Sequence, residues 1–206
     1  MDNSYKEESK AQMSVHHEEA EVLYKQAPGT LEKTVKFLQE DKVVVLPCDT
    51  IYGLCAKVGP AEQALRSVKY RGETKSFLIL ATLEQAKEIC IVPEDVEKAW
   101  PCALTAILLN REGGGTTAVR VPADDFLQEV LTKLGSCIYS TSVNESGYLA
   151  ITNITDIIFS FKDRVPAFVV GSEKQGTVPS TLIDCTTKPY TLVRCGQYDA
   201  SELLKG

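Results

Sequence analysis

Histidine is nearly absent from the chain, and both copies lie close to its start. His16 and His17 are the only histidines among the 206 residues. The rest of the chain therefore lacks the usual general base for Ser or Cys nucleophiles and the commonest metal ligand. Adjacent histidines without further nearby ligands are in most proteins solvated surface residues. The sequence thus argues against Ser-His, Cys-His and zinc hydrolases, and it predicts no protein-held metal site.

The chain also has no C-x-x-C pair among its seven cysteines. Most of them lie in apolar runs, where a reduced thiol packs as a small hydrophobic group. They are Cys48, Cys55, Cys90, Cys102, Cys137, Cys185 and Cys195. Neither a structural zinc site nor a disulfide framework is indicated.

No apolar run approaches the roughly eighteen residues that a membrane-spanning helix needs. The start, MDNSYKEESK, lacks the apolar stretch of a signal peptide. We therefore expect a cytoplasmic protein without a membrane partner. The net charge of -6 argues against broad, unspecific nucleic-acid binding, which depends on cationic residues, although a local basic cleft stays open.

The common phosphate-binding loops are missing as well. The chain contains neither G-x-x-x-x-G-K-[ST] nor a G-x-G-x-x-G that follows a strand. The glycine run at 113–115 precedes a strand instead of opening a helix, which favours a flexible turn. Any nucleotide site must therefore be of a less common kind.

The alternation of strand-like and helix-like segments predicts one domain over residues 29–206, preceded by a polar tail or extension over 1–28. Thr30 is predicted to cap the first helix. Strands are expected at 43–47, 77–80, 104–109, 118–122, near 138, and at 167–170, 181–184 and 191–194. Helices are expected from residue 31 to about 38 and at 60–70, 83–91, 94–100 and 125–134. This order indicates an α/β fold, a single domain with a twisted mixed sheet flanked by helices.

The string LPCDTIYGL, at 46–54, comes where an apolar strand ends and the chain becomes polar. Ligands of α/β sheets tend to bind beyond the carboxyl ends of strands. Asp49 and Thr50 are therefore either ligand-binding residues or simple turn formers.

The string KYRGETK begins at Lys69 and also has two interpretations. Lys69 and Arg71 could stabilise the end of a helix through its dipole, with Gly72 as a left-handed cap. Where the helix unwinds, the same two cations could instead converge on a triphosphate.

The string STSVNESG, at 140–147, follows a short apolar strand. In extended backbone, Ser142 and Asn144 point to the same side and could present a hydroxyl and an amide to one ligand. Loops rich in Ser and Asn are common, so the string alone decides little.

Together with WPCALT at 100–105, AVRVP at 118–122 and PSTLID at 179–184, these strings resemble the threonylcarbamoyl-AMP synthase (YrdC-like) family. The resemblance covers about 30–194 and is to the short, single-domain type. It implies a YrdC-like catalytic domain over 29–206. Six moderately specific strings in the right order carry this resemblance.

The resemblance implies a set of site residues. The family's K-x-R and S-x-N tetrad falls on Lys69, Arg71, Ser142 and Asn144. Threonine would be held by Thr50, Arg120 and Ser180. The nucleotide would be contacted by Arg71, Lys75, Thr105, Thr141, Ser142 and Arg194.

The chain departs from the family's usual pattern in several places. It reads PCDT for P-T-D-T, KYRG for K-G-R-P, PCALT for P-G-P-L-T and SVN for S-A-N. Most of these changes affect neighbours of the implied ligands. Leu80 stands where some relatives carry a threonine-contacting histidine, so this change bears on amino-acid selection.

The family reaction joins L-threonine, bicarbonate or carbon dioxide, and ATP with Mg²⁺ into threonylcarbamoyl-AMP and pyrophosphate. A nucleotidyltransferase of this kind needs no protein nucleophile, which fits a domain without histidine. The resemblance implies a downstream partner, the tRNA threonylcarbamoyl transferase complex. Two alternatives stay open: a carbamoyl-adenylate-forming domain of the hydrogenase-maturation type, and a non-catalytic factor that binds double-stranded RNA during ribosome maturation.

Overall fold

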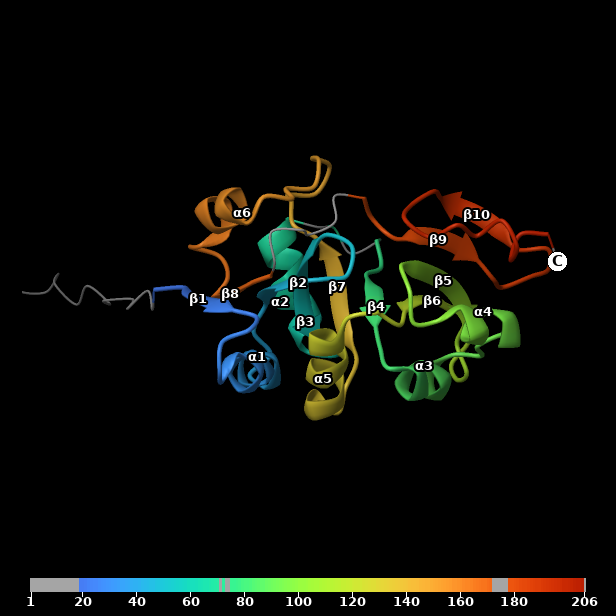
Figure 1. Ribbon diagram of the computed structural model, residues 1–206, viewed down its shortest axis with the longest axis horizontal. Helices are drawn as coiled ribbons and strands as arrows, with labels where there is room; N and C mark the ends of the chain where they lie inside the picture. Colours follow the sequence, from blue (N-terminus) through green and yellow to red (C-terminus); the bar gives the residue numbers. More distant parts are fainter. Residues whose placement is uncertain (1–18, 71, 73–74, 172–177, 206) are drawn as a thin grey trace, which may run out of the picture.

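The computed structural model describes residues 19–70, 72, 75–171 and 178–205. Ten strands of these residues form one mixed sheet in the order β1-β8-β2-β3-β7-β4-β6-β5-β9-β10 (Figure 1). The strands are β1 (Glu21–Tyr24), β2 (Val44–Pro47), β3 (Tyr52–Lys57), β4 (Leu78–Leu80), β5 (Leu104–Leu109), β6 (Thr116–Arg120), β7 (Ile138–Ser142), β8 (Ala167–Val170), β9 (Thr181–Asp184) and β10 (Thr191–Arg194). The helices are α1 (Thr30–Gln39), α2 (Ala61–Lys69), α3 (Leu83–Ile89), α4 (Glu94–Ala99), α5 (Asp125–Leu134) and α6 (Ile154–Phe161).

The mixed character of the sheet confirms the predicted fold class. Strand pairs β1–β8, β2–β8, β4–β6 and β5–β9 are parallel, whereas β2–β3, β3–β7, β4–β7, β5–β6 and β9–β10 are antiparallel. Direct hairpins such as β2–β3 alternate with helical crossovers along the chain, which produces both kinds of pairing. None of the helices in the described residues is long and apolar enough to cross a membrane.

The period of two along β2 explains how helices cover both faces of one half of the sheet. Val44 and Leu46 belong to a core with α1 and α5, whereas Val43 and Val45 belong to a core with α2 and α6. Figure 1 shows α1 and α5 side by side below the sheet. A further core, which includes Trp100 of the segment after α4, packs α3 and α4 on the half formed by β5, β6 and β9.

The amino-terminal boundary differs from our prediction. Residues 21–24, within the segment expected to be a tail, form β1 and pair in parallel with β8. Leu23 is buried against the α1 side of the sheet, whereas its strand neighbours Val22 and Tyr24 are exposed. Residues 1–18 of the expected tail lie outside the described residues.

Two predicted caps are also wrong. Gly29, with φ 81°, is the N-cap of α1, while Thr30 is the first helical residue and donates its hydroxyl to the carbonyl of Tyr24 at 2.8 Å. At the end of α2 the left-handed residue is Tyr70, with φ 49°, and not Gly72. The N-cap of α1 thus comes one residue earlier than predicted, and the left-handed residue after α2 comes two residues earlier.

Two further elements were not predicted. The segment that we expected to be a polar turn after Pro47 contains β3, which is buried along most of its length between β2 and β7. Helix α6 begins after Asn153, whose side-chain oxygen accepts the backbone N–H groups of Thr155 and Asp156. Ile157 and Phe161 bury one face of this helix against β8.

Candidate functional site

A cavity of about 610 Å³ crosses the middle of the sheet. Seven neighbouring strands, from β3 through β10 in sheet order, each contribute at least one lining residue. These strand residues are Tyr52, Gly53, Leu78, Thr105, Arg120, Ser140, Thr141, Ser142, Leu182 and Arg194. Loops next to β3, β4, β7 and β9 complete the wall, which therefore collects hydroxyl groups and two guanidinium groups from distant parts of the chain.

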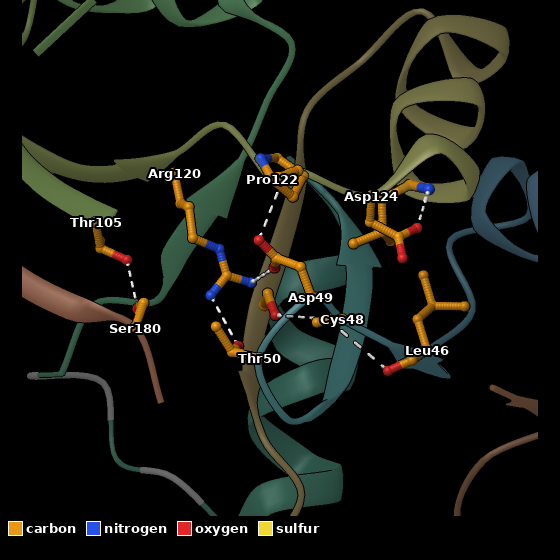
Figure 2. Close-up of polar contacts among 12 residues, drawn as sticks. Leu46, Cys48, Asp49, Thr50, Thr105, Arg120, Pro122, Asp124 and Ser180 are labelled. Atoms are coloured by element: carbon orange, nitrogen blue, oxygen red, sulfur yellow. Dashed lines mark hydrogen bonds and ion pairs between the residues drawn. The ribbon is translucent and has the colours of Figure 1, made fainter. Parts of the chain in front are cut away.

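Arg120 is the best anchored charged group in this wall. Its Nη1 donates to Oγ1 of Thr50 at 3.0 Å, and its Nη2 forms an ion pair with Oδ1 of Asp49 at 3.1 Å. Asp49 in turn accepts the backbone N–H of Ala123 at 3.2 Å. Figure 2 shows Arg120 extending from β6 toward the loop that carries Asp49 and Thr50. The loop after β2 is thus tied to β6 by charge.

The third donor of Arg120 has no such partner. Only 3% of the residue is exposed, yet its Nε makes no hydrogen bond to any described part of the chain. Buried donors are almost always paired with protein, water or ligand, and an unpaired one carries a desolvation cost of about 1–3 kcal/mol. In a wall of this cavity, the Nε–H group is therefore suited to hold an anionic oxygen of a ligand.

Thr105, Ser180 and Arg194 form a second polar group on the wall. The hydroxyls of Thr105 and Ser180 lie 2.7 Å apart, as Figure 2 shows. Arg194 donates from Nε and Nη2 to the carbonyl of Ser180 at 3.1 and 2.9 Å. Burial of its guanidinium end, and then the charge of Arg120, lower the pKa of Arg194, which nevertheless stays a cation. Two neighbouring cations favour anionic ligands.

Lys69 joins α2 to the end of β7. Its ammonium donates to the carbonyl of Ser142 at 2.6 Å and to Oδ1 of Asn144 at 2.7 Å. Ser142 also donates its hydroxyl to Oδ1 of Asn144 at 2.6 Å. The amide nitrogen of Asn144 donates to the carbonyls of Glu145 and Tyr148, so it holds the following turn instead of facing the cavity beside Ser142.

The structure brings most of the predicted site residues to this one cavity. The predicted residues that line it are Thr50, Thr105, Arg120, Thr141, Ser142, Ser180 and Arg194. Lys69 and Asn144 contact Ser142 from behind the wall, and exposed Lys75 precedes Ser76, which is a lining residue. Arg71 lies outside the described residues, and the roles of all these residues stay predictions.

Three of the wall residues that sequence reasoning missed lie next to one another. Ser140 lies on β7 two positions before Ser142, so the period of two along the strand could have identified it. Gly53 faces Ser140, and a Cβ at this position would come within 2.8 Å of its hydroxyl. The third is Cys48, in the string PCDT. No local signal distinguished this thiol from the buried cysteines.

The thiols of Cys48 and Cys55 share the neighbourhood of Ser140. Sγ of Cys48 donates to the carbonyl of Leu46 at 3.8 Å and lies 4.0 Å from Oγ of Ser140, to which Cys55 donates at 3.6 Å. The neighbouring thiol of Cys55 lowers the pKa of Cys48, and the charge of Arg120 acts in the same direction, against burial. The neighbouring Cys48 thiol, and then burial, raise the pKa of Cys55 well above its usual value.

Metal binding has little support from the side chains alone. Within the described ranges, no group of three or more His, Cys, Asp or Glu side chains is arranged to hold a metal ion. Asp49 is the carboxylate nearest to the Arg120 guanidinium, and its contacts are taken up by Arg120 and Ala123.

Curated relatives match this chain over most of its length. A threonylcarbamoyl-AMP synthase of Pyrococcus abyssi is 30% identical over 188 aligned residues, which cover 82% of this chain and 54% of the relative. The chain spans about half the length of the curated relatives it matches first.

Two solved structures share the fold. Pyrococcus abyssi Sua5 complexed with L-threonine aligns with a TM-score of 0.80 and 26% identity, covering 89% of this chain and 59% of that one. Escherichia coli YciO aligns with a TM-score of 0.78 and 20% identity, covering 90% of this chain and 100% of that one, which shows the common fold alone. The family model for the Sua5, YciO and YrdC proteins matches residues 36–196 of this chain. The description of that family reads "telomere recombination". Because this match spans most of the chain, the protein belongs to the Sua5/YciO/YrdC family.

Proposed function

We propose that the chain is an L-threonylcarbamoyladenylate synthase, a nucleotidyltransferase that forms threonylcarbamoyl-AMP and pyrophosphate for tRNA modification. The observation that carries this proposal is the buried, unpaired Nε of Arg120 in a cavity with a second guanidinium, that of Arg194. The family and the naming of its relatives as threonylcarbamoyl-AMP synthases support the same reaction.

The amino acid would bind at the Arg120 end of the cavity. Its carboxylate would accept a hydrogen bond from Nε, while Nη1 and Nη2 remain with Thr50 and Asp49. A charge-assisted bond of this kind stabilises a complex by about 1.5–3 kcal/mol. The Thr50 and Ser180 hydroxyls would orient the substrate. The threonine bound in Pyrococcus abyssi Sua5 supports this choice of amino acid.

ATP would occupy the remaining part of the cavity. A volume of about 610 Å³ lies within the range of small-molecule sites, roughly 300–1,000 Å³. Thr105, Thr141 and Ser142 would bind the nucleotide through their hydroxyls, and Arg194 would offset phosphate charge. Lys75 and Arg71, by the family resemblance, would add cations at the triphosphate.

The reaction needs no nucleophile from the protein. The threonine amine forms a carbamate either with carbon dioxide, releasing a proton, or with bicarbonate, releasing water. The carbamate oxygen attacks the α-phosphorus of ATP. One P–O bond forms to the carbamate, the bond to the β-phosphate oxygen breaks, and pyrophosphate leaves with the electron pair. The protein contributes positioning and charge stabilisation, which dominate phosphoryl-type transfer. Lys69 would act by holding Ser142 and Asn144 in place.

Mg²⁺ would enter as part of the MgATP substrate, held chiefly by phosphate oxygens. Magnesium is often bound through one or two carboxylates together with substrate phosphates. This fits a wall in which no described cluster of three metal-ligating side chains is present. Its chemistry would be to neutralise charge on the triphosphate.

We propose that the product passes to a tRNA threonylcarbamoyl transferase complex. The two alternatives make different use of the same cleft. A carbamoyl-adenylate-forming domain would release pyrophosphate with carbamoyl phosphate in place of threonine and bicarbonate. A non-catalytic RNA-binding factor would shift the gel mobility of double-stranded RNA, less so at high salt, and would consume no ATP.

Pyrophosphate release with defined omissions tests the function. The full chain is incubated with MgATP, L-threonine and bicarbonate, and each component is left out in turn. We expect release only in the complete mixture. Release that ignores threonine, or that requires carbamoyl phosphate, would contradict the proposal in favour of the carbamoyl-adenylate reaction.

A further inference from the structure

We propose that Cys48 is a covalent modification site for small carboxylate-bearing electrophiles, which the guanidinium groups of the cavity bring onto its thiol. The geometry of the cavity supports this modification site without any assumption about the reaction. Only its consequence, blockage of the substrate site, rests on the proposed function.

The position of Cys48 gives its thiol one route to solvent. The residue lines the cavity although it is only 4% exposed, so reagents must be small and must enter through the cavity. Its Sγ lies on the floor formed by Gly53 and Ser140, 4.0 Å from the Ser140 hydroxyl. Figure 2 shows Cys48 next to Asp49, the residue that forms an ion pair with Arg120.

Arg120 supplies the recognition element for a carboxylate. Its Nε is unpaired within the described structure, is enclosed, and belongs to the wall that Cys48 also lines. The charge of Arg120 acts on the Cys48 thiol, so the two groups share one electrostatic environment. A carboxylate that accepts from Nε would therefore hold its reactive carbon in the same cavity as the sulfur.

The thiol network also favours Cys48 over the other buried cysteines as a nucleophile. The neighbouring Cys55 thiol and the charge of Arg120 lower the pKa of Cys48, which favours its thiolate, the reactive form. Burial raises the pKa of the other cysteines in the cores and at their edges. These are Cys90, Cys102, Cys137, where it reaches about 11, and Cys185, where it reaches about 12.

The chemical step is a simple displacement. With iodoacetate as the probe, the sulfur of the Cys48 thiolate attacks the methylene carbon, a C–S bond forms, and the C–I bond breaks. Iodide leaves with the electron pair, and the thiol proton has passed to solvent. No oxidant, reductant or metal is required.

The test compares a charged with an uncharged reagent of nearly the same size. The full chain is treated with limiting iodoacetate or iodoacetamide, and peptide mass spectrometry measures the labelling rate of Cys48. Each rate is divided by the rate for glutathione with the same reagent. Exposed Cys195 serves in every sample as proof that the reagent was active.

We expect the normalised rate at Cys48 to favour iodoacetate roughly ten-fold, the effect of one charge-assisted hydrogen bond. L-Threonine or another small carboxylate in excess should slow the labelling of Cys48 and leave Cys195 unchanged. Labelling of Cys195 without Cys48, or equal normalised rates for both reagents at Cys48, would overturn the proposal.

Two variants test the identity of the labelled residue and the effect of its neighbour Cys55. Cys48→Ser should remove the label at this position while Cys195 still reacts. Cys55→Ala removes the thiol that lowers the pKa of Cys48 and should slow the labelling of Cys48 several-fold with both reagents, leaving their ratio unchanged. If the reagent preference is found in a protein without synthase activity, the proposed function fails and the modification site stands.

Discussion

The guanidinium of Arg120 has two nitrogens in contact with Thr50 and Asp49, and a third, Nε, that is buried and has no hydrogen-bond partner among the described residues. Thr50 and Asp49 fix its plane, so the direction of Nε–H is set before any ligand binds. Such preorganisation lowers the entropy cost of binding, because the donor needs no reorientation. Among the described residues, Arg120 is therefore the most important one for the proposed ligand binding.

Arg120→Lys should weaken threonine binding about ten-fold to a hundred-fold. Lysine keeps the charge but cannot contact Thr50, Asp49 and a ligand together, and losing one charge-assisted bond costs about 1.5–3 kcal/mol. Titration calorimetry measures the change, with thermal unfolding run beside it. Arg111→Lys is the matched control, because exposed Arg111 donates to the carbonyl of Lys87 away from the cavity. Equal threonine affinity in both variants would contradict the role of Arg120.

Lys69 should contribute mainly through structure. It is 2% exposed and donates to the carbonyls of Ser142 and Asn144 and to the Asn144 side chain. Lys69→Met fills a similar volume but leaves these acceptors without the ammonium, and each buried unpaired group costs about 1–3 kcal/mol. Urea unfolding should therefore show a loss of at least about 2 kcal/mol. A loss below about 0.5 kcal/mol would show that the contacts are not needed.

The limits of sequence reasoning at this scale are visible in Asn144. Alternation placed its side chain beside that of Ser142, and the Ser142 hydroxyl does donate to Oδ1 of Asn144. However, β7 ends at Ser142 and the chain then turns, so the amide nitrogen of Asn144 donates to the carbonyls of Glu145 and Tyr148. Arg120 and Thr50 could be selected from the family strings, whereas their contact could not be foreseen, because they lie on segments 70 residues apart.

At the scale of elements, the turn after β10 positions two wall residues. Gly196 packs so closely on the start of β9 that a Cβ would lie 2.3 Å from the carbonyl carbon of Ser180 and 2.4 Å from the nitrogen of Thr181. The same turn places Arg194 against Ser180. This close backbone approach fixes the β10 side of the cavity.

Gly196→Ala should therefore destabilise the protein and disturb the cavity. The backbone must move, and overpacking of this kind typically costs about 1–3 kcal/mol. Gly72→Ala is the control for stability, since a Cβ there would meet no atom within 4 Å. Thermal melts with and without ATP measure both effects. A Gly196→Ala protein that is as stable as Gly72→Ala would contradict the described packing.

The first strand gives an independent test of the domain boundary. Deleting residues 1–25 removes β1, whereas deleting 1–18 leaves it in place. Burial of Leu23 stabilises by about 1.5–3 kcal/mol, and the pairing with β8 adds hydrogen bonds. The longer deletion should thus lose at least about 2 kcal/mol more in urea unfolding than the shorter one. Equal stability of the two truncations would place β1 outside the folded unit.

Most elements could be predicted because their period or their apolar runs were clear. Strands β5, β8, β9 and β10 and helix α5 begin and end where we expected. Strand β3 was missed because its sequence, YGLCAK, contains glycine and alanine and no run of β-branched residues. Helix α6 was missed because its Ile and Thr residues favour strands, and burial of Ile157 and Phe161 decides its structure.

At the scale of the whole molecule, the site exists only when the two halves of the sheet are joined. Strands β3 and β7 belong to the half covered by α1, α5, α2 and α6, while β5 and β9 belong to the half covered by α3 and α4. The cavity runs across both, so each ligand would contact segments from both halves. The order of these segments along the sheet could not be read from their order along the chain.

The most direct test of the central claim is the identity of the product. The full chain is incubated with MgATP, L-threonine and ¹³C-bicarbonate, and the nucleotides are separated and weighed by mass spectrometry. The account predicts threonylcarbamoyl-AMP that carries one heavy carbon from bicarbonate, formed together with pyrophosphate and absent when threonine is omitted. AMP or an adenylate without both threonine and the labelled carbon, or no adenylate from a folded protein, would contradict it.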